Sequence, residues 1–448
     1  MTTRFSDSTL FRLIPPAPMQ HLVDDALCLI FSYCVTAESS ANLPNPAITR
    51  APWKLTLVCS RWRQIALLIK RLWASFEVDS CNPWLLQVWL DRSGNHPLEF
   101  VWNRPCQSIC HIEHSTDHAH SVCSRAKLLC EEYTRWRSVT VMVQTSCLTQ
   151  HLTNMSYDHT GVPYLESLQI EGNNSLMSRD VLFDIRYATL LKSLCLPFKT
   201  ESVLMGDSVF LRLTSLISTG FMFNIGMPTD EWLSLLTRCP NVARSHIMLS
   251  DLSPTPQMCN VLELPIQDLV VGFHGAGVIQ TFMDKLCLPA LANLRLHQQE
   301  MGTSFTQPAS YLKCFIRRSN CSLRSVRLAS LDFSERSLVQ CLHLMPQLEV
   351  LHLTAMDVSE LFLESMSHVD ADNCLSVCPR LRKIKIADVT EALQDVNVND
   401  MIVSRWNAKG RNLRMVELES CGLEPDPIPA GIRACQLDGL EYLVWGLV

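Results

Sequence analysis

The chain of 448 residues is long enough for two or three domains, or for one small domain followed by a repeat array. Apolar residues make up 47% of it, which excludes an intrinsically disordered chain and allows a large core. The net charge of −6, with both signs interspersed, argues against nucleic acid as the main partner, and no apolar run reaches the ~18 residues of a membrane span.

The twenty cysteines do not suggest a disulfide scaffold, because that interpretation belongs to short secreted chains. Many of them lie in apolar segments, where a free cysteine acts as a small hydrophobic residue: Cys34, Cys195, Cys287 and Cys341. Residues 1–20 are predicted to be flexible and lack the apolar core of a secretory signal. We therefore expect a reducing compartment, the cytoplasm or the nucleus.

The first predicted helix covers residues 22–34. Asp24 and Asp25 stand where a helix N-terminus favours carboxylates. Behind them follows an apolar stripe made of Leu27, Ile30, Phe31 and Cys34. A polar, proline-containing loop at 35–52 separates this helix from the next one.

The second predicted helix, of about 17 residues, lies within 53–73. Steps of three and four line one face with Leu55, Val58, Trp62, Ile65 and Ile69. Lys70 and Arg71 fall in its last turn, where cations suit the helix dipole. Such a helix must pack on a neighbour, because it cannot bury a tryptophan and several aliphatic side chains alone.

The order of residues at 58–62 (VCSRW) followed by 71–73 (RLW) strongly resembles the second half of an F-box, in the form common in large fungal F-box families. The helix at 22–34 resembles the first F-box helix, with Leu22 matching and Val23 in place of the usual proline. The resemblance implies an F-box domain at 21–80 that docks to a Skp-type adaptor and, through it, to a cullin ubiquitin ligase. It also implies that the adaptor surface is formed or supported by Leu22, Val23, Leu27, Ile30, Phe31, Val58, Cys59, Trp62, Leu72 and Trp73. The alternative is an ordinary pair of core helices.

Residues 81–130 are predicted to connect the F-box to a repeat region at 131–448. A short strand is expected at 75–80, a helix at 83–91 with Leu86 and Leu90 on one face, and then a turn into a strand around Phe100. A similar sequence segment connects the F-box and the repeats in the fungal F-box proteins.

The repeat region repeats the pattern L-x-x-L-x-L about every 28 residues, near the upper end of the leucine-rich-repeat range. The clear copies start at Leu165, Leu191, Ile266, Leu291, Leu323, Leu348, Leu381 and Leu413, and weaker copies start at Trp136, Leu213, Val242 and Leu440. Amphipathic segments at 230–239, 310–319, 335–344 and 399–408 lie between copies, and the first and third of them are followed within two residues by a proline. This predicts an α/β fold, in which an irregular leucine-rich-repeat solenoid with parallel strands inside and helices outside follows a three-helix F-box. The alternative is a globular α/β domain with buried parallel strands.

The strand residue between the second and third apolar positions is expected to face the concave surface. In order along the chain these residues are Gln169, Cys195, Arg295, Arg327, His352, Lys385 and Glu417. Arg295, Arg327, His352, Lys383 and Lys385 are therefore the predicted substrate-binding residues, which would favour an acidic partner segment. The alternative is an ordinary solvated face.

Three motifs are candidates for chemistry. Three cysteines and four histidines within 106–123 could bind zinc, but they lack a C-x-x-C pair and finger spacing. His274 stands in a glycine-rich phrase without the G-x-S-x-G elbow of a hydrolase. Asp395, Asn397 and Asn399 mimic a calcium loop, but Asp400 replaces its glycine and Trp406 its glutamate.

The function that the resemblance implies is recruitment, without catalytic residues, metal or cofactor: the substrate-recognition subunit of a Skp–cullin–F-box ubiquitin ligase. Its predicted partners are the adaptor and an unknown protein substrate, with no nucleic acid and no membrane. The alternatives are a scaffold with a degenerate F-box and, less favoured, a zinc-binding or hydrolase protein.

Overall fold

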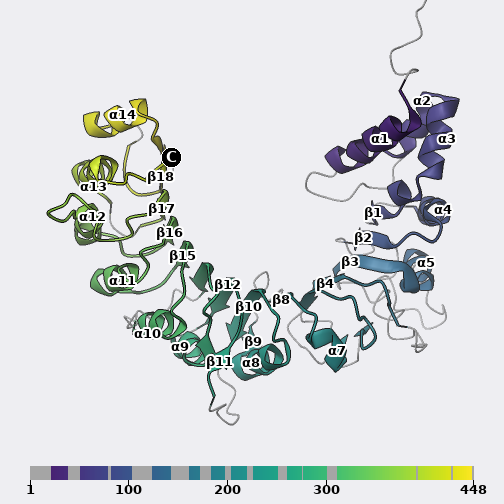
Figure 1. Cartoon of the computed structure of the whole chain (residues 1–448), viewed down its shortest axis with the longest axis horizontal. Coiled ribbons are helices and arrows are strands. Elements are labelled where there is room, and N and C mark those ends of the chain that lie inside the picture. The colour runs from purple at the N-terminus through teal and green to yellow at the C-terminus, as the bar shows by residue number, and fades with distance from the viewer. Residues whose placement is uncertain are drawn as a thin grey trace, which may run out of the picture. The chain divides into compact units, whose positions relative to one another are not determined.

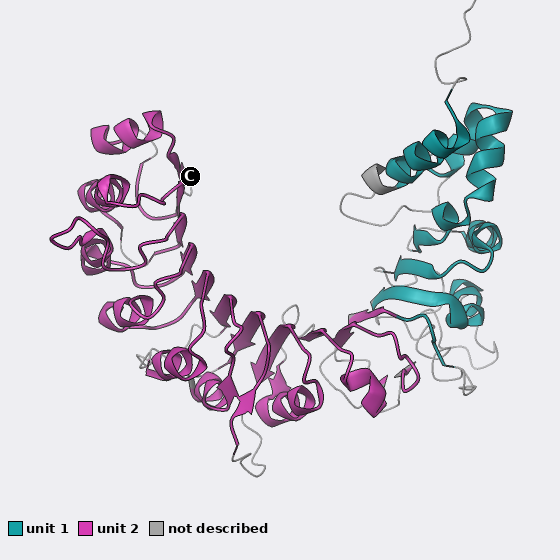
Figure 2. Cartoon of the chain, in the orientation of Figure 1, with its two compact units in different colours: residues 1–165 teal, residues 166–448 magenta. Residues whose placement is uncertain are grey.

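The structure is a computed structural model, and its described residues fall into two compact units, 1–165 and 166–448 (Figure 2). The described residues are 22–38, 51–78, 82–102, 124–142, 161–171, 183–196, 203–218, 226–250, 260–274, 276–299, 310–389, 392–424 and 427–445. The predicted flexible segment 1–20 and the Cys/His cluster at 106–123 lie outside them. The division at Leu165 falls within the predicted repeat region at 131–448.

Unit 1 begins with helices and continues as a short parallel ladder (Figure 1). Strand β1 pairs with β2 and β2 pairs with β3, both in parallel. The elements in chain order are α1 (Asp24–Glu38), α2 (Trp53–Val58), α3 (Ser60–Leu68), the 3-10 turn η2 (Lys70–Trp73), β1 (Ser75–Glu77), α4 (Pro83–Ser93), β2 (Leu98–Trp102), α5 (Ser124–Glu131), the 3-10 turn η3 (Tyr133–Arg135) and β3 (Trp136–Met142). The strands and helix expected between 75 and 102 are thus confirmed.

The single helix expected within 53–73 is wrong, because Cys59 and Ile69 interrupt it. Cys59 is extended (φ −158°, ψ 172°), and its thiol accepts a hydrogen bond from the Trp62 N–H at 3.5 Å as the N-cap of α3. The interruption turns Val58 out of the predicted apolar stripe, so that its side chain is exposed, while Ile65 stays buried. Three short segments therefore replace one long amphipathic helix.

A chain of aromatic contacts joins the helices of unit 1 to its strands. The consecutive ring centroids lie 5.4 to 6.2 Å apart in the order Trp53, Trp73, Trp89, Phe76, Phe100 and Trp136. The Arg92 guanidinium lies over the Trp53 and Trp73 rings, at 4.0 and 4.4 Å from their centroids. The helices and the first strands consequently share one core.

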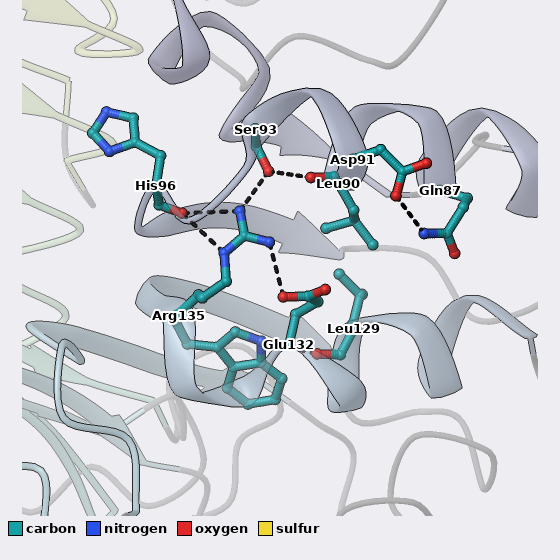
Figure 3. A network of polar contacts seen from close by, with 9 residues as sticks. Gln87, Leu90, Asp91, Ser93, His96, Leu129, Glu132 and Arg135 are labelled. Atoms are coloured by element: carbon teal, nitrogen blue, oxygen red, sulfur yellow. Dashed lines mark hydrogen bonds and ion pairs between the residues drawn. The ribbon is translucent and has the colours of Figure 1, made fainter.

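A polar network around Arg135 fixes the entry into β3 (Figure 3). Its guanidinium donates to the Glu132 carboxylate at 2.8 Å, to the His96 carbonyl at 3.0 Å and to the Ser93 hydroxyl at the end of α4. The Trp136 indole N–H donates to the Leu129 carbonyl, seven residues earlier, at 3.1 Å. The Trp73 indole makes the same bond to the carbonyl of Ala66, also seven residues earlier, at 2.9 Å. The turns before β1 and β3 are therefore built alike.

Unit 2 is a stack of parallel strands whose order across the sheet follows their order in the chain, as right-handed strand–helix connections allow. Within this unit the strands line the inner side of an arc and the helices its outer side (Figure 1). The main strands are β4 (Ser167–Glu171), β6 (Ser193–Leu196), β8 (Ser215–Ser218), β10 (Arg244–Ser250), β12 (Asp268–Phe273), β14 (Asn293–Gln298), β15 (Ser325–Ala329), β16 (Val350–Thr354), β17 (Lys383–Ala387), β18 (Met415–Glu419) and β19 (Glu441–Trp445). The α/β class and the parallel strand stack are thereby confirmed.

Short elements complete unit 2. Three pairs of two-residue or edge strands are parallel: β5 (Phe183–Asp184) with β7 (Val203–Leu204), β9 (Met227–Pro228) with β10, and β11 (Leu262–Glu263) with β13 (Leu286–Cys287). The helices are α7 (Asp207–Phe210), α8 (Thr229–Arg238), α9 (Ala276–Asp284), α10 (Ser310–Ser319), α11 (Glu335–Leu342), α12 (Glu360–Ser367), α13 (Asp395–Asn407) and α14 (Ala430–Leu437). Each longer helix buries residues three or four apart, for example Tyr311, Phe315 and Ser319 in α10.

The last predicted copy of the repeat, starting at Leu440, is wrong by one residue. The register pairs Val416 with Tyr442 and Glu417 with Leu443, so Tyr442 takes the buried position. Leu443 and Trp445 stand on the opposite face and are exposed. A strand alternates faces with a period of two, so a shift of one residue reverses every side chain in it.

A shared backbone feature follows four consecutive strands. The residue after each of β15 to β18 has a left-handed φ between 50° and 56°, and its N–H donates to the last residue of the next strand at 2.8 to 3.0 Å. These residues are Ser330, Ala355, Asp388 and Ser420. None of them is a glycine, so all four carry the strain of a Cβ atom in this conformation.

Replacing Ala355 by glycine is expected to stabilise unit 2 by about 0.5–1 kcal/mol, because glycine relieves the strain at φ 50°. The matched control is Ala329→Gly, at the end of β15, where φ is not positive. That change should destabilise by a similar amount. Urea unfolding measures the change in the free energy of unfolding for both variants. A loss of stability in Ala355→Gly would show that Ala355 is not strained at this position.

Candidate functional site

Helix α1 is apolar on two opposite faces. Leu27, Phe31 and Val35 are spaced four residues apart and are buried, with the Phe31 ring 4.9 Å from that of Trp62 in α3. Leu29 and Tyr33 share the other face and are 60% and 71% exposed. A helix with apolar side chains on both faces is typical of one covered on both sides.

The same region exposes further large apolar side chains: Val23 directly before α1, Leu57 and Val58 in α2, and Leu68 at the end of α3. Each of the four is between 59% and 76% exposed. Scattered single residues of this kind are common on protein surfaces, but six within about 50 residues make this region a candidate interaction surface. We call Val23, Leu29, Tyr33, Leu57, Val58 and Leu68 the N-terminal apolar set.

The predicted adaptor residues divide between surface and core. Val23, Val58 and Cys59 are exposed, and Leu22, Ile30 and Trp62 are half-buried. The remaining four are buried and can only support a surface: Leu27, Phe31, Leu72 and Trp73. The sequence analysis did not identify Leu29, Tyr33, Leu57 and Leu68. Leu29 and Tyr33 each lie two residues after a buried residue, Leu27 and Phe31, and this offset could have predicted a second apolar face on the helix.

Charged side chains fix the start of α1 against α3. The Arg61 guanidinium pairs with the Asp24 carboxylate at 2.6 Å and also donates to the Leu22 carbonyl. Arg71 donates to the Ser32 hydroxyl at 2.6 Å. These contacts hold α1 beside α3, and exposed Arg63 and Lys70 add positive charge nearby.

The second surface is the inner face of unit 2, where the strand register aligns one residue from each strand. The aligned row runs Gln169, Cys195, Ile217, His246, Val270, Arg295, Arg327, His352, Lys385, Glu417 and Leu443. The structure therefore brings Arg295, Arg327, His352 and Lys385 together on adjacent strands, with Lys383 two residues before Lys385. We call the eleven aligned residues from Gln169 to Leu443 the inner row; Lys383 lies beside it.

The predicted run of positive charge is shorter than expected. Lys383 Nζ lies 2.5 Å from a Glu417 carboxylate oxygen, and Lys385 Nζ lies 2.6 Å from one of Glu419. Both lysines are thus neutralised by the neighbouring strand β18. The sequence pattern identified the lysines but not the two glutamates opposite them.

His352 lies between Arg327 and Lys385 and is uncharged at neutral pH. Burial, together with the positive charges of Arg327 and Lys383, lowers the pKa of His352 to about 4, against a smaller opposing effect of Glu417. Its Nε2 atom is buried and has no hydrogen-bonding partner among the described residues. Burial likewise lowers the pKa of His246, whose Nε2 lies 3.7 Å from Asp268.

Acidification is expected to destabilise unit 2 in part through His352. Because its pKa falls from 6.5 in the unfolded chain to about 4 in the folded one, the unfolded state binds more protons between these values, and stability declines as pH drops from 6.5 to 4. His352→Gln should remove on the order of 1 kcal/mol of this decline after allowing for solvent screening. Urea unfolding of both proteins at pH 7 and pH 4.5 measures the difference, and an equal decline in both would contradict it.

Two of the three candidate motifs for chemistry lie among the described residues, and the Cys/His cluster at 106–123 lies outside them. Asp395, Asn397 and Asn399 lie within helix α13, where a calcium loop cannot form. His274 comes directly after β12, and Gly275, the next residue of its glycine-rich segment, is outside the described residues. Within the described ranges no three His, Cys, Asp or Glu side chains are grouped to hold a metal ion. Burial raises the pKa of the Cys239 and Cys378 thiols to about 12, which makes them poor nucleophiles.

Comparison with protein-family models and with curated proteins gives no match to this chain. In the part of the chain that the structure describes, no helix has the length and apolar character needed to cross a bilayer. The class defined by fold and surface is an α/β repeat protein with a helical N-terminal module.

Proposed function

We propose that this chain is the substrate receptor of a Skp–cullin–F-box ubiquitin ligase. In this proposal the helices α1 to α3 dock the Skp-type adaptor, and the inner row of unit 2 holds a target protein. The chain contributes proximity between target and ligase and supplies no catalytic group. The resemblance of residues 58–62 and 71–73 to an F-box motivates the choice of adaptor.

The observation that carries the proposal is the N-terminal apolar set. An isolated helix pair would lose stability and solubility by exposing six large apolar side chains, so their presence favours a partner that covers them. Docked interfaces of this kind have an apolar centre and a polar rim. Arg63 and Lys70 are placed to serve as the rim.

Receptor function is supported by the geometry of unit 2. Parallel strands stacked in chain order present an extended surface on which side chains of many repeats act together. Polar and charged groups dominate the inner row from His246 to Glu417, which suits recognition of a polar protein segment.

The test is co-purification of the full chain with a recombinant Skp-type adaptor. We expect the two proteins to elute together in size-exclusion chromatography at equal stoichiometry, whereas the adaptor alone elutes later. Separate elution at micromolar concentrations would contradict ligase membership and leave the scaffold alternative, which Val23 in the position of the usual proline makes a specific candidate.

A further inference from the structure

Strand β19 forms the last edge of the described sheet and carries an exposed apolar surface. It pairs with β18 on one side, and no described strand pairs with its other side. Leu443 and Trp445 lie on its inner face and are 38% and 47% exposed. Open edge strands in natural proteins are usually blunted by lysine, proline or a bulge, and the described residues 441–445 contain none of these. This edge is therefore suited to pairing with another strand.

The open edge offers the backbone groups of two residues. The Glu441 N–H donates to the Arg414 carbonyl at 2.9 Å, so the backbone groups of Glu441 face β18. Successive residues of a strand direct their N–H and carbonyl groups to opposite sides of the strand. The N–H and carbonyl groups of Tyr442 and Val444 therefore point away from β18, to the open edge.

A second copy of the same strand fits this pattern when it runs antiparallel with Leu443 opposite Leu443. Tyr442 of each copy then faces Val444 of the other, and residues paired in this way exchange both of their N–H to carbonyl hydrogen bonds. This register overlaps the two strands over their whole length of five residues. The two-fold axis runs perpendicular to the sheet, so the buried faces of both copies stay on the same side.

The charges along the edge favour this antiparallel arrangement. Glu441 is the only charged residue of the strand, and it lies opposite Trp445 of the second copy. A parallel pairing in register would instead place Glu441 beside its own counterpart, and like charges opposite each other are destabilising. On the neighbouring strand β18, Glu417 and Glu419 are paired with the lysines of β17, so the two carboxylates next to the edge are compensated.

We propose that β19 is a self-association surface through which two copies of this chain join their sheets. The edge is occupied by β19 of a second copy, antiparallel and centred on Leu443, and the inner faces of the two sheets become continuous. The contact comprises one strand pair and the exposed side chains of Leu443 and Trp445, which is small, so the dimer dissociates in the micromolar range. The inference goes beyond the proposed function and does not depend on the adaptor.

Sedimentation velocity of the full chain at pH 7.5 measures the association over roughly 1–100 µM. We expect a concentration-dependent shift from monomer to dimer. Trp445→Glu should raise the dissociation constant about tenfold or more, because it removes the ring and places a carboxylate opposite Glu441 of the second copy. The matched control is Leu361→Glu, which makes a similar change at a 55% exposed position of α12 and should leave association unchanged.

A charge-swapped variant tests the register. Adding Glu441→Lys to Trp445→Glu places a lysine opposite a glutamate at both ends of the antiparallel contact. Relative to Trp445→Glu alone, the double variant should associate about threefold more tightly or better. A parallel contact, or one in another register, predicts no such recovery.

Four results would overturn the proposal. The first is a chain that stays monomeric at every concentration, which would leave the edge to a segment of another protein. The second is undiminished association of Trp445→Glu, which would place self-association elsewhere, such as the N-terminal apolar set. The others are an equal loss in Leu361→Glu and the absence of recovery in the double variant. Failed co-elution with the adaptor, with this dimer intact, would reject the proposed function alone.

Discussion

The double variant Leu29→Asp, Leu57→Asp is expected to weaken adaptor binding by about 100-fold or more. Both side chains belong to the N-terminal apolar set and are 60% and 62% exposed, so a buried carboxylate would be introduced at the interface and not into the core. Central apolar contacts in such interfaces each contribute about 2 kcal/mol or more, and two of them account for the expected factor. The affinity is measured by calorimetry with the purified adaptor.

A control for this variant exists at the other end of the chain. Leu437 in α14 is 88% exposed, and Leu437→Asp makes the same chemical change outside the proposed interface. It should leave the affinity unchanged, and all three substitutions should leave urea stability nearly unchanged because they lie on the surface. Undiminished affinity in the double variant would place the adaptor elsewhere on the chain.

Arg405→Met is expected to produce the largest loss of stability, about 3 kcal/mol or more. The Arg405 guanidinium is buried and donates to the carbonyls of Met366, Val377 and Cys378 at 2.6 to 3.2 Å. Methionine has a similar length but no donor, so three buried carbonyl groups would lose their partner. Burial of the guanidinium is itself unfavourable and lowers the pKa of Arg405 to about 10. Removing this buried charge therefore offsets part of the stability lost with the hydrogen bonds.

Two comparison variants make this expectation specific. Arg405→Lys keeps the charge but reaches fewer of the three carbonyls, and should lose roughly half as much stability. Arg336→Met, at an exposed position of α11, should change stability by less than about 0.5 kcal/mol. Urea unfolding measures all three, and a loss below about 1 kcal/mol in Arg405→Met would show that the segment 368–378 does not depend on this side chain.

The strands and outer helices of unit 2 could be predicted from sequence because their signals are local. In α8, α10 and α11 the apolar residues recur at helical spacing, and the observed bounds differ from the expected ones by at most two residues. Leu294, Val326, Leu351, Ile384 and Val416 supply the second apolar position of five successive strands and are fully buried. The buried face of these five strands was therefore predictable from their period of two.

The remaining features depend on contacts between residues far apart in sequence. The neutralisation of Lys383 requires Glu417, 34 residues later, and is visible only when the strand register is known. The interruption at Cys59 is a cap geometry that competes with a continuous apolar stripe. The left-handed residues after β15 to β18 share no residue type that could have marked them.

The aromatic chain from Trp53 to Trp136 has a practical consequence for dissecting the protein. Cutting the polypeptide near residue 80 would separate Trp73 from Trp89 and Phe76 from Phe100, which exposes large rings on both fragments. Removal of the first 80 residues would therefore leave Trp89 of α4 and Phe100 of β2 without the rings that cover them. A full-length chain in which surface substitutions abolish adaptor binding is therefore better suited to capturing targets than a chain that lacks its first 80 residues.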